Sequence, residues 1–238
     1  MNGEVTRVAE ALLFDIFTCG EEERFLFEGL EYPWQALPLL GERLRGRLPP
    51  GIEVGEGVSL EGVFFDSPQL LIAPRAIIEP TVVITGGPVF VGPGAHLAAG
   101  AYIRGPAYLG ERSTVGHACE VKNSILLQGA CAAHFNYVGD SILGPGVNLG
   151  AGAKLGNLRL DRGPVSVLWR GMRVDTGLKK LGALIGDWCS LGCNAVCNPG
   201  TILHPGVHVL PCAVVGGTHV RGTVGRPGSV SRGRGEAL

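Results

Sequence analysis

The sequence predicts a mainly β protein, in which a parallel β-helix of six-residue repeats follows a short helical segment. From Val54 onward one apolar residue recurs about every six positions, and a glycine or polar residue usually follows it. This period fits neither a helix nor a simple alternating strand, but it fits one short strand plus one turn. The 39 glycines and 16 prolines alternate with Val, Ile and Leu, which is typical of tight turns between strands.

The apolar repeat also predicts the core and the size of each coil. Three six-residue units of strand and turn close one triangular coil, and successive coils pair edge to edge in parallel. The predicted inward side chains are Ile72, Ile78, Ile84, Val91, Leu97, Ile103, Leu109, Val115, Val121, Leu127, Ala133, Leu143, Leu149, Leu155, Ile185, Leu191, Cys197, Leu203, Val209 and Val215.

The chain divides into three predicted parts. Residues 1–50 form a helical segment, with apolar residues at helical spacing in 8–17 and 34–48, and with prolines that end the second helix. We expect its aromatic residues to cap the end of the coil, because the terminal coil is otherwise open. Residues 51–220 form the β-helix, interrupted by a loop at 156–184, and residues 221–238 form a flexible tail.

Composition and charge argue against several classes of protein. The formal net charge of −1 gives no basic field for nucleic acid. The chain lacks an apolar run of about 18 residues, so we expect no membrane insertion. The N-terminus lacks the basic and apolar regions of a secretory signal, and the odd count of 7 cysteines favours reduced thiols. We therefore expect a cytoplasmic protein.

The sequence argues against a metal site. Cys189, Cys193 and Cys197 are four residues apart, which weakly suggests zinc. However, Cys189 and Cys197 occupy positions where the repeat places small or apolar residues, and paired CxxC motifs are absent.

Polar residues gather between Glu120 and Asn157, where the repeat is interrupted. Arg104 and Lys122 are separated by three full repeats, so we expect them to stack at the same corner of adjacent coils. Two stacked cations repel unless an anion or a carboxylate such as Glu120 lies between them. A phosphate-binding pair and a solvated corner are both compatible with this pattern.

A histidine lies close to this cluster in the predicted coil. His134 and Asn148 are expected on the same face of successive coils, and therefore close together, with Tyr137 and Asn157 nearby. A single histidine on a turn is usually a surface residue, but its grouping with these polar side chains favours a functional site.

These residues form motifs that resemble a known family. The repeat is similar to that of the hexapeptide-repeat acyltransferases, which form left-handed parallel β-helices. Within that family the spacing is similar to the acetyltransferase domain of bacterial glucosamine-1-phosphate acetyltransferase/uridylyltransferases. The motifs that carry the resemblance are Glu120-Val-Lys122-Asn-Ser, His134-Phe-Asn-Tyr137-Val-Gly-Asp140, Gly146-Val-Asn148-Leu-Gly-Ala-Gly152 and Gly156-Asn157.

The resemblance implies roles for individual residues. Arg104 and Lys122 would bind a sugar phosphate, and His134 would act as the general base, with Asn157 as a second catalytic residue. The remaining residues that would bind the acceptor are Glu120, Tyr137, Asn148 and Lys180, the last of these reaching in from a neighbouring subunit.

The resemblance also implies a cofactor groove and an assembly. Ala151, Cys193 and Val215 would line a groove for acetyl-CoA, which is a substrate, and the groove would lie between the subunits of a homotrimer. Two positions depart from the family: Leu158 stands where a tyrosine is expected, and Cys193 stands where a serine is expected. These departures bear on the acceptor sugar and the acyl group.

The function that we expect is acyl-CoA-dependent N-acetylation of an amino-sugar phosphate, in the synthesis of sugar nucleotides or cell-envelope precursors. An imidazole can take the proton from the amine, and backbone N–H groups can stabilise the oxyanion, so the reaction requires no metal. The alternatives are acylation of a nucleotide-linked sugar, a non-catalytic trimeric scaffold, and a metal-dependent carbonic anhydrase that would use His117 and His134.

Overall fold

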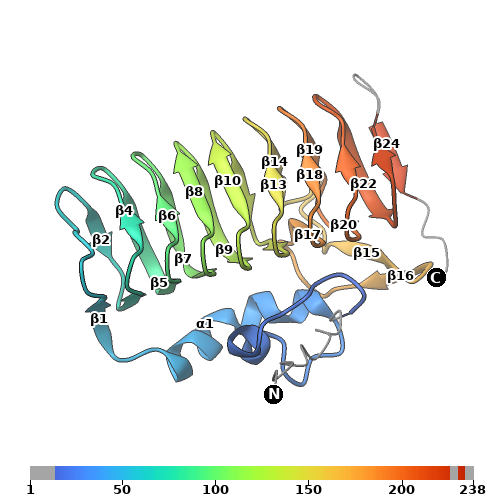
Figure 1. The fold of residues 1–238 in the computed structure, drawn as a ribbon. Helices are drawn as coiled ribbons and strands as arrows, with labels where there is room; N and C mark the ends of the chain where they lie inside the picture. The colour runs from blue at the N-terminus through green and yellow to red at the C-terminus, as the bar shows by residue number, and fades with distance from the viewer. Residues whose placement is uncertain (1–13, 226–229, 234–238) are drawn as a thin grey trace, which may run out of the picture.

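The structure is a computed structural model that describes residues 14–225 and 230–233, with only the backbone for the last four. It confirms the mainly β fold, a parallel β-solenoid of about ten turns (Figure 1). Its strands are short because each turn of the triangular coil ends a strand after a few residues.

One side of the coil, here called the first face, is a parallel sheet of eight strands. Along each strand, side chains that point out of the coil alternate with small or apolar side chains that point into it. The strands are, in spatial order, β23(Thr223–Val224), β21(His208–Val209), β18(Ser190–Leu191), β13(Asn148–Leu149), β10(Cys131–His134), β8(Thr114–His117), β6(His96–Leu97) and β4(Ile77–Ile78).

A sheet of 14 strands covers the other two sides. The strands are β1(Gly51–Val54), β2(Phe64–Asp66), β3(Gln69–Ile72), β5(Val83–Val91), β7(Tyr102–Leu109), β9(Glu120–Leu126), β11(Tyr137–Gly139), β12(Ile142–Leu143), β14(Lys154–Leu155), β17(Ala183–Ile185), β19(Val196–Cys197), β20(Thr201–Leu203), β22(Val214–His219) and β24(Val230–Gly233).

This sheet divides into two ladders because its long strands bend. The N-terminal part of β9 pairs with β11, and its C-terminal part pairs with β12. We call the ladder that contains β11, β14 and β19 the second face, and the ladder that contains β12, β17 and β20 the third face. The corner between the first and second faces includes residues 134–136.

The coil that carries the polar cluster is shorter than predicted. Arg104 pairs with Lys122, three full repeats later as expected, but Tyr137 pairs with Glu120, which precedes it by one residue less than three repeats. The inward side chains after Val121 are therefore Leu126 and Ala132, and the prediction of Leu127 and Ala133 was wrong. β7 carries one extra residue in a β-bulge between Arg104 and Ala107, and β9 lacks it, so the spacing between paired residues falls by one at this point.

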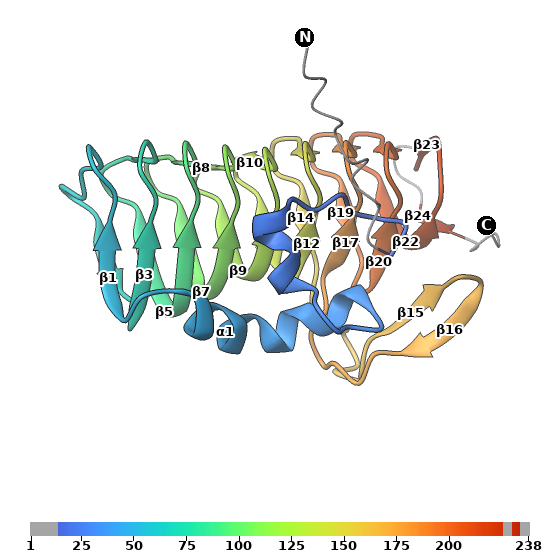
Figure 2. The same ribbon diagram turned by 60° about the horizontal axis from the view of Figure 1, so that its bottom comes forward.

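The N-terminal segment lies along the coil, and the expectation that it caps the end was wrong. It contains η1(Glu21–Leu26), η2(Pro33–Gln35) and α1(Ala36–Arg47), and Figure 2 shows α1 beside successive coils. Its apolar side chains bury the outward side chains of the third face, including Tyr108, Ile125 and Ile142. Most of the helix expected over 8–17 lies outside the described residues, and residues 14–16 form a turn.

The other two parts outside the repeat also contain strands. The insert at 156–184 carries an antiparallel hairpin, β15(Ser166–Trp169) and β16(Met172–Asp175), where a loop was predicted. Trp169 packs against Trp34 with ring centroids 5.4 Å apart. In the predicted flexible tail, β23 pairs with β21 and β24 pairs with β22, so part of the tail extends the coil. Among the described residues, no helix has the length and apolar character to cross a membrane.

Candidate functional site

The predicted stack of Arg104 and Lys122 is present on the second face, and a carboxylate accompanies each cation. The backbone register pairs the two residues on adjacent coils. Arg104 Nη1 donates to Glu120 Oε1 at 2.7 Å, and this hydrogen bond raises the pKa of Arg104. Lys122 Nζ lies 3.0 and 2.9 Å from the two carboxylate oxygens of Asp140. Carboxylates therefore compensate the two stacked cations.

Tyr137 and Asn157 converge beside this stack. Tyr137 is the register partner of Glu120 on the next coil, and burial raises its pKa, with a further contribution from the charges of Glu120 and Asp140. Gly139 makes room for both side chains. A Cβ at Gly139 would lie 2.6 Å from Tyr137 Oη and 2.8 Å from Asn157 Nδ2.

His134 ends β10 at the corner between the first and second faces, and its side chain is exposed. The turn that follows is held by buried Asn136, whose Oδ1 accepts from the His134 N–H at 3.0 Å and whose Nδ2 donates to the Gly150 carbonyl at 2.8 Å. The corner therefore presents the His134 imidazole to solvent three residues before Tyr137. His117 is its register partner on the preceding coil.

Asn148 does not lie opposite His134, although both residues are on the first face as expected. Asn148 pairs with Cys131, at the other end of β10. The residue opposite His134 is Ala151, because the Gly152 N–H donates to the His134 carbonyl at 2.9 Å. The expectation that Asn148 and His134 lie close together was thus wrong, because β10 separates them along its whole length.

Small side chains continue the corner beyond His134. Ala151 is followed on the next coil by Cys193, since the Asn194 N–H donates to the Ala151 carbonyl at 2.8 Å. Ala151 is half-buried and Cys193 is exposed, so a strip without bulky side chains runs beside His134. Val215 does not contribute a side chain to this surface, because it is fully buried in the core. Its neighbour Val214 is the outward residue of β22.

The insert returns to the coil next to Asn157. Leu158 and Lys180 form an isolated antiparallel bridge, and the Leu181 N–H donates to the Asn157 carbonyl at 3.0 Å. The backbone of Lys180 is thereby held beside the cluster of its own chain, and its side chain is exposed.

Asp140 is a member of the cluster to which the sequence alone assigned no role. Its buried carboxylate accepts from Lys122, from Asn123 Nδ2 at 2.8 Å and from Asn157 Nδ2. Its position one coil after Lys122 and Asn123 was the available signal. Asp140 also closes the motif that begins at His134. That motif alone did not show that the Asp140 carboxylate contacts both Lys122 and Asn157.

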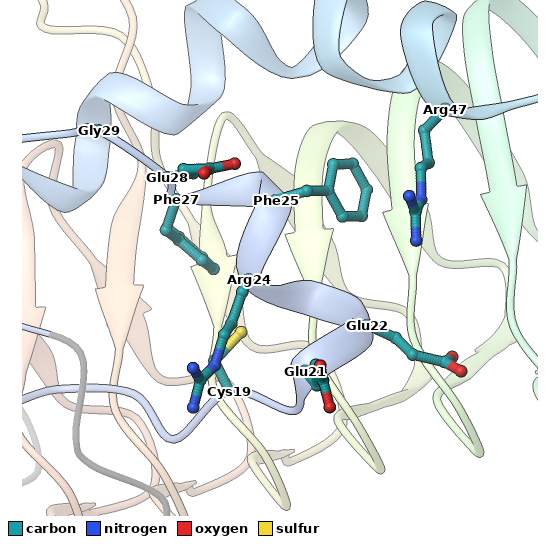
Figure 3. A pocket seen from close by; sticks show the side chains of 9 residues that line it. All are labelled: Cys19, Glu21, Glu22, Arg24, Phe25, Phe27, Glu28, Gly29 and Arg47. Atoms are coloured by element: carbon teal, nitrogen blue, oxygen red, sulfur yellow. The ribbon is translucent and has the colours of Figure 1, made fainter.

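Neither the histidines of the first face nor the N-terminal cavity forms a second defined site among the described residues. Within residues 14–225, no three His, Cys, Asp or Glu side chains are grouped so as to hold a metal ion, although His117 and His134 are register partners. A cavity of about 660 Å³ lies in the N-terminal segment (Figure 3), where the Arg47 guanidinium lies 5.6 Å from the Phe25 ring centroid. Its lining is largely exposed and carries both charge signs, so it specifies no single ligand class.

Comparisons with known proteins agree with the sequence motifs. No protein-family model matches the chain. A bifunctional sugar-1-phosphate nucleotidylyltransferase/acetyltransferase of Sulfurisphaera tokodaii is 39% identical over 105 residues, which cover 44% of this chain and 26% of that protein. The bifunctional protein GlmU of Methanococcus maripaludis is 40% identical over 90 residues, which cover 38% of this chain and 22% of that protein.

A third relative, YaiX of Escherichia coli, is an uncharacterized protein named as an acetyltransferase. It is 34% identical over 101 residues, which cover 42% of this chain and 44% of YaiX. The matches span about a quarter of the length of the first two relatives. An Arabidopsis UDP-N-acetylglucosamine acyltransferase structure covers 78% of this chain at 13% identity, with a TM-score of 0.36 that is too low to support an argument. Over the matched stretches, the relatives of this chain are thus proteins named as GlmU or as acetyltransferases, which agrees with the resemblance that the motifs carry.

Proposed function

We propose, from the homology of this chain to GlmU-type acetyltransferase domains, that it transfers an acetyl group from acetyl-CoA to the amine of a phosphorylated amino sugar. The observation that carries this proposal is the register of the second face. It stacks Arg104 on Lys122 and brings Tyr137 and Asn157 to the same polar cluster, with His134 at the adjoining corner.

The paired cations remain suited to a phosphate. The Arg104–Glu120 pair is substantially exposed, with side-chain exposures of 45% and 31%, and pairs of this kind contribute only about 0–1 kcal/mol. A phosphate dianion can therefore replace Glu120 beside Arg104. The ammonium of Lys122 has three N–H donors, and its contacts with Asp140 occupy at most two of them, so a donor remains for the phosphate.

The exposed imidazole of His134 is proposed to accept the proton of the acceptor amine. The amine nitrogen then bonds to the thioester carbonyl carbon, and the resulting oxyanion re-forms the carbonyl as the C–S bond breaks. The CoA sulfur leaves as a thiolate that takes up a proton. The developing oxyanion requires N–H donors at the same place.

The acyl donor is proposed to lie along the strip formed by Ala151 and Cys193. Their small side chains leave room beside His134, which a thioester must reach. A groove of this kind needs a second wall, because the strip is open to solvent in one chain. We propose that a neighbouring subunit of a homotrimer provides this wall.

The first test measures thiol release from acetyl-CoA with glucosamine 1-phosphate as acceptor. We expect Lys122→Ala to raise KM about 10- to 100-fold with a smaller change in kcat, because the phosphate contact is lost. We expect His134→Ala to lower kcat by about 10²- to 10⁴-fold, the usual contribution of a general base. His208→Ala is the matched control, since His208 is also exposed on the first face but lies in β21.

Two outcomes would contradict the proposal. One outcome is that no amino-sugar phosphate supports thiol release from acetyl-CoA, whereas a nucleotide-linked amino sugar does. This result would assign a different acceptor. Equal losses of both kinetic parameters in the Lys122 and His134 variants would contradict the separate roles.

A further inference from the structure

We infer that Asp140 is a positioning residue that holds Lys122 at the acceptor phosphate and Asn157 at the reaction centre. This inference rests on the proposed function and extends it to a residue behind the substrate surface. The Asp140 side chain is 6% exposed, so it is largely shielded from a ligand on the second face. It acts through the donors that surround it.

The geometry places the Asp140 carboxylate between three side chains. Lys122 lies within 3.0 Å of both oxygens, Asn123 Nδ2 lies 2.8 Å from Oδ1, and Asn157 Nδ2 donates to Oδ2. Lys122 and Asn123 precede Asp140 by one coil, and Asn157 follows it by one coil. The carboxylate therefore connects three successive coils at the corner between the second and third faces.

The charge of this carboxylate matters for Lys122, whose side chain is only 21% exposed. Burial of an ammonium without a partner is costly, and an ionised carboxylate both compensates the charge and directs the flexible side chain. A lysine side chain loses rotamer entropy when it is held in one conformation. Because Asp140 already orders Lys122, a phosphate that binds there does not have to immobilise the lysine again.

The contact with Asn157 orients the other end of the cluster. The Asn157 amide nitrogen is committed to Asp140, so its oxygen points away from the carboxylate. A Cβ built on Gly139 would lie 2.8 Å from this amide nitrogen and 2.6 Å from Tyr137 Oη, so both atoms face the same point. Asn157 also hydrogen-bonds Tyr137, a contact that lowers the pKa of Tyr137 against the larger opposing effect of burial. A shift of the Asn157 amide therefore disturbs Tyr137 as well.

A purely conformational role does not account for these contacts. Asp140 has φ of 46°, a left-handed conformation that Asn adopts as readily as Asp. Its backbone hydrogen bonds, from its N–H to the Lys122 carbonyl and from the Gly182 N–H to its carbonyl, are both 2.8 Å and do not involve the carboxylate. Asn at this position keeps the turn and removes the charge.

The test is the kinetics of Asp140→Asn, an isosteric change. We expect KM for glucosamine 1-phosphate to rise about 10- to 100-fold and kcat to fall several-fold, because small displacements of positioning groups have effects of this size. Asp161→Asn is the matched control. Asp161 pairs with Arg159 at the exposed start of the insert, and its loss should change neither parameter more than about twofold.

A double-mutant cycle separates positioning from general damage. If Asp140 acts on the acceptor through Lys122, Asp140→Asn should change KM by less than about threefold in a Lys122→Met background. Full additivity of the two effects on KM would overturn the inference.

The same double variant also shows whether Asp140→Asn acts only by preventing folding. If Asp140→Asn fails to fold because Lys122 is left as a buried cation, Lys122→Met/Asp140→Asn should fold and retain the Lys122→Met KM. If the double variant also fails while Lys122→Met folds, the role of Asp140 is structural and the inference is overturned.

A failure of the proposed function would be recognised separately. If the wild-type protein acetylates no amino-sugar phosphate, the proposed function fails. The inference is then judged by calorimetric binding of glucosamine 1-phosphate. Binding at least tenfold weaker in Asp140→Asn than in wild type supports it, whereas equal affinity, or no binding by wild type, overturns it.

Discussion

Gly139 shows at the scale of one residue how the scaffold makes room for the site. The missing Cβ lets Tyr137 Oη and Asn157 Nδ2 approach the same point above the backbone of β11. Gly139 does not have a positive φ, so alanine fits its backbone conformation. The requirement for glycine at this position therefore comes from the side chains of the site.

Gly139→Ala is expected to displace Tyr137 and Asn157 while the coil remains folded. We expect kcat/KM to fall by about 10²-fold, the effect of a displacement of about 1 Å at a reaction centre. Gly46→Ala is the control, because nothing lies within 4 Å of a Cβ at that helical position. Wild-type kinetics in Gly139→Ala would show that the two side chains have no role in the reaction.

We expect the cysteines to differ in reactivity, because some side chains point into the core and others point to solvent. Cys189 and Cys197 point into the core, where burial raises the pKa of each thiol to about 12. Cys193 and Cys212 are exposed at the corner between the first and second faces. Cys189 and Cys197 therefore point away from the exposed Cys193.

Thiol labelling of the native protein at pH 8 is expected to modify Cys193 and Cys212 rapidly. Cys189 and Cys197 should react only after denaturation, because the thiolate is the reactive form and is negligible at this pH. Mass spectrometry identifies the labelled sites. Acetyl-CoA should slow labelling of Cys193, and equal labelling rates with and without it would contradict the proposed groove.

At the scale of elements, the N-terminal segment and the insert form a second layer on the third face. Trp34 stacks on Tyr32 with ring centroids 4.6 Å apart and meets Trp169 of the hairpin edge to face. The Thr18 side chain also donates to Asp187 of the coil at 2.6 Å. The N-terminal segment and the insert, which are far apart in the sequence, are therefore joined through one apolar cluster.

Trp34→Ala is expected to lower the free energy of unfolding by about 3–5 kcal/mol, the usual cost of truncating a large aromatic side chain in a core. Trp34 is 2% exposed. Trp188→Ala is the matched control, since Trp188 is 69% exposed, and its loss should cost less than about 1 kcal/mol. Chemical denaturation measures both values. Similar losses would show that the N-terminal layer does not stabilise the fold.

At the scale of the whole molecule, the N-terminal layer determines which faces can meet another subunit. It covers the third face, so the first and second faces and the corner between them remain accessible. Phe135, next to His134 on this corner, is 58% exposed. An exposed aromatic side chain beside a half-open site is consistent with the proposed homotrimer.

Light scattering is expected to give a mass three times the chain mass of 24.8 kDa. Phe135→Asp should reduce this mass, because a carboxylate would be buried at the subunit contact. Phe64→Asp is the control. Phe64 is 59% exposed but lies in the first coil, away from the site. A wild-type monomer at assay concentration would exclude a groove shared between subunits.

The six-residue period was enough to predict the coil and several neighbours in the polar cluster. A six-residue period states which side chains point inward, so the core positions and the stack of Arg104 on Lys122 could be predicted. Residues one coil apart become neighbours through this period alone. Motif spacing likewise predicted the similarity to GlmU proteins and the proximity of Tyr137 and Asn157.

Features that the period does not encode emerged only in the folded chain. The coil at the polar cluster is one residue shorter than three repeats, which moved the inward positions to Leu126 and Ala132. The N-terminal segment has no repeat, so its docking on the third face depends on apolar surfaces distant in sequence. Asp140 gains its role because three coils bring Lys122, Asn123 and Asn157 to one carboxylate, a convergence that exists only after the chain has folded.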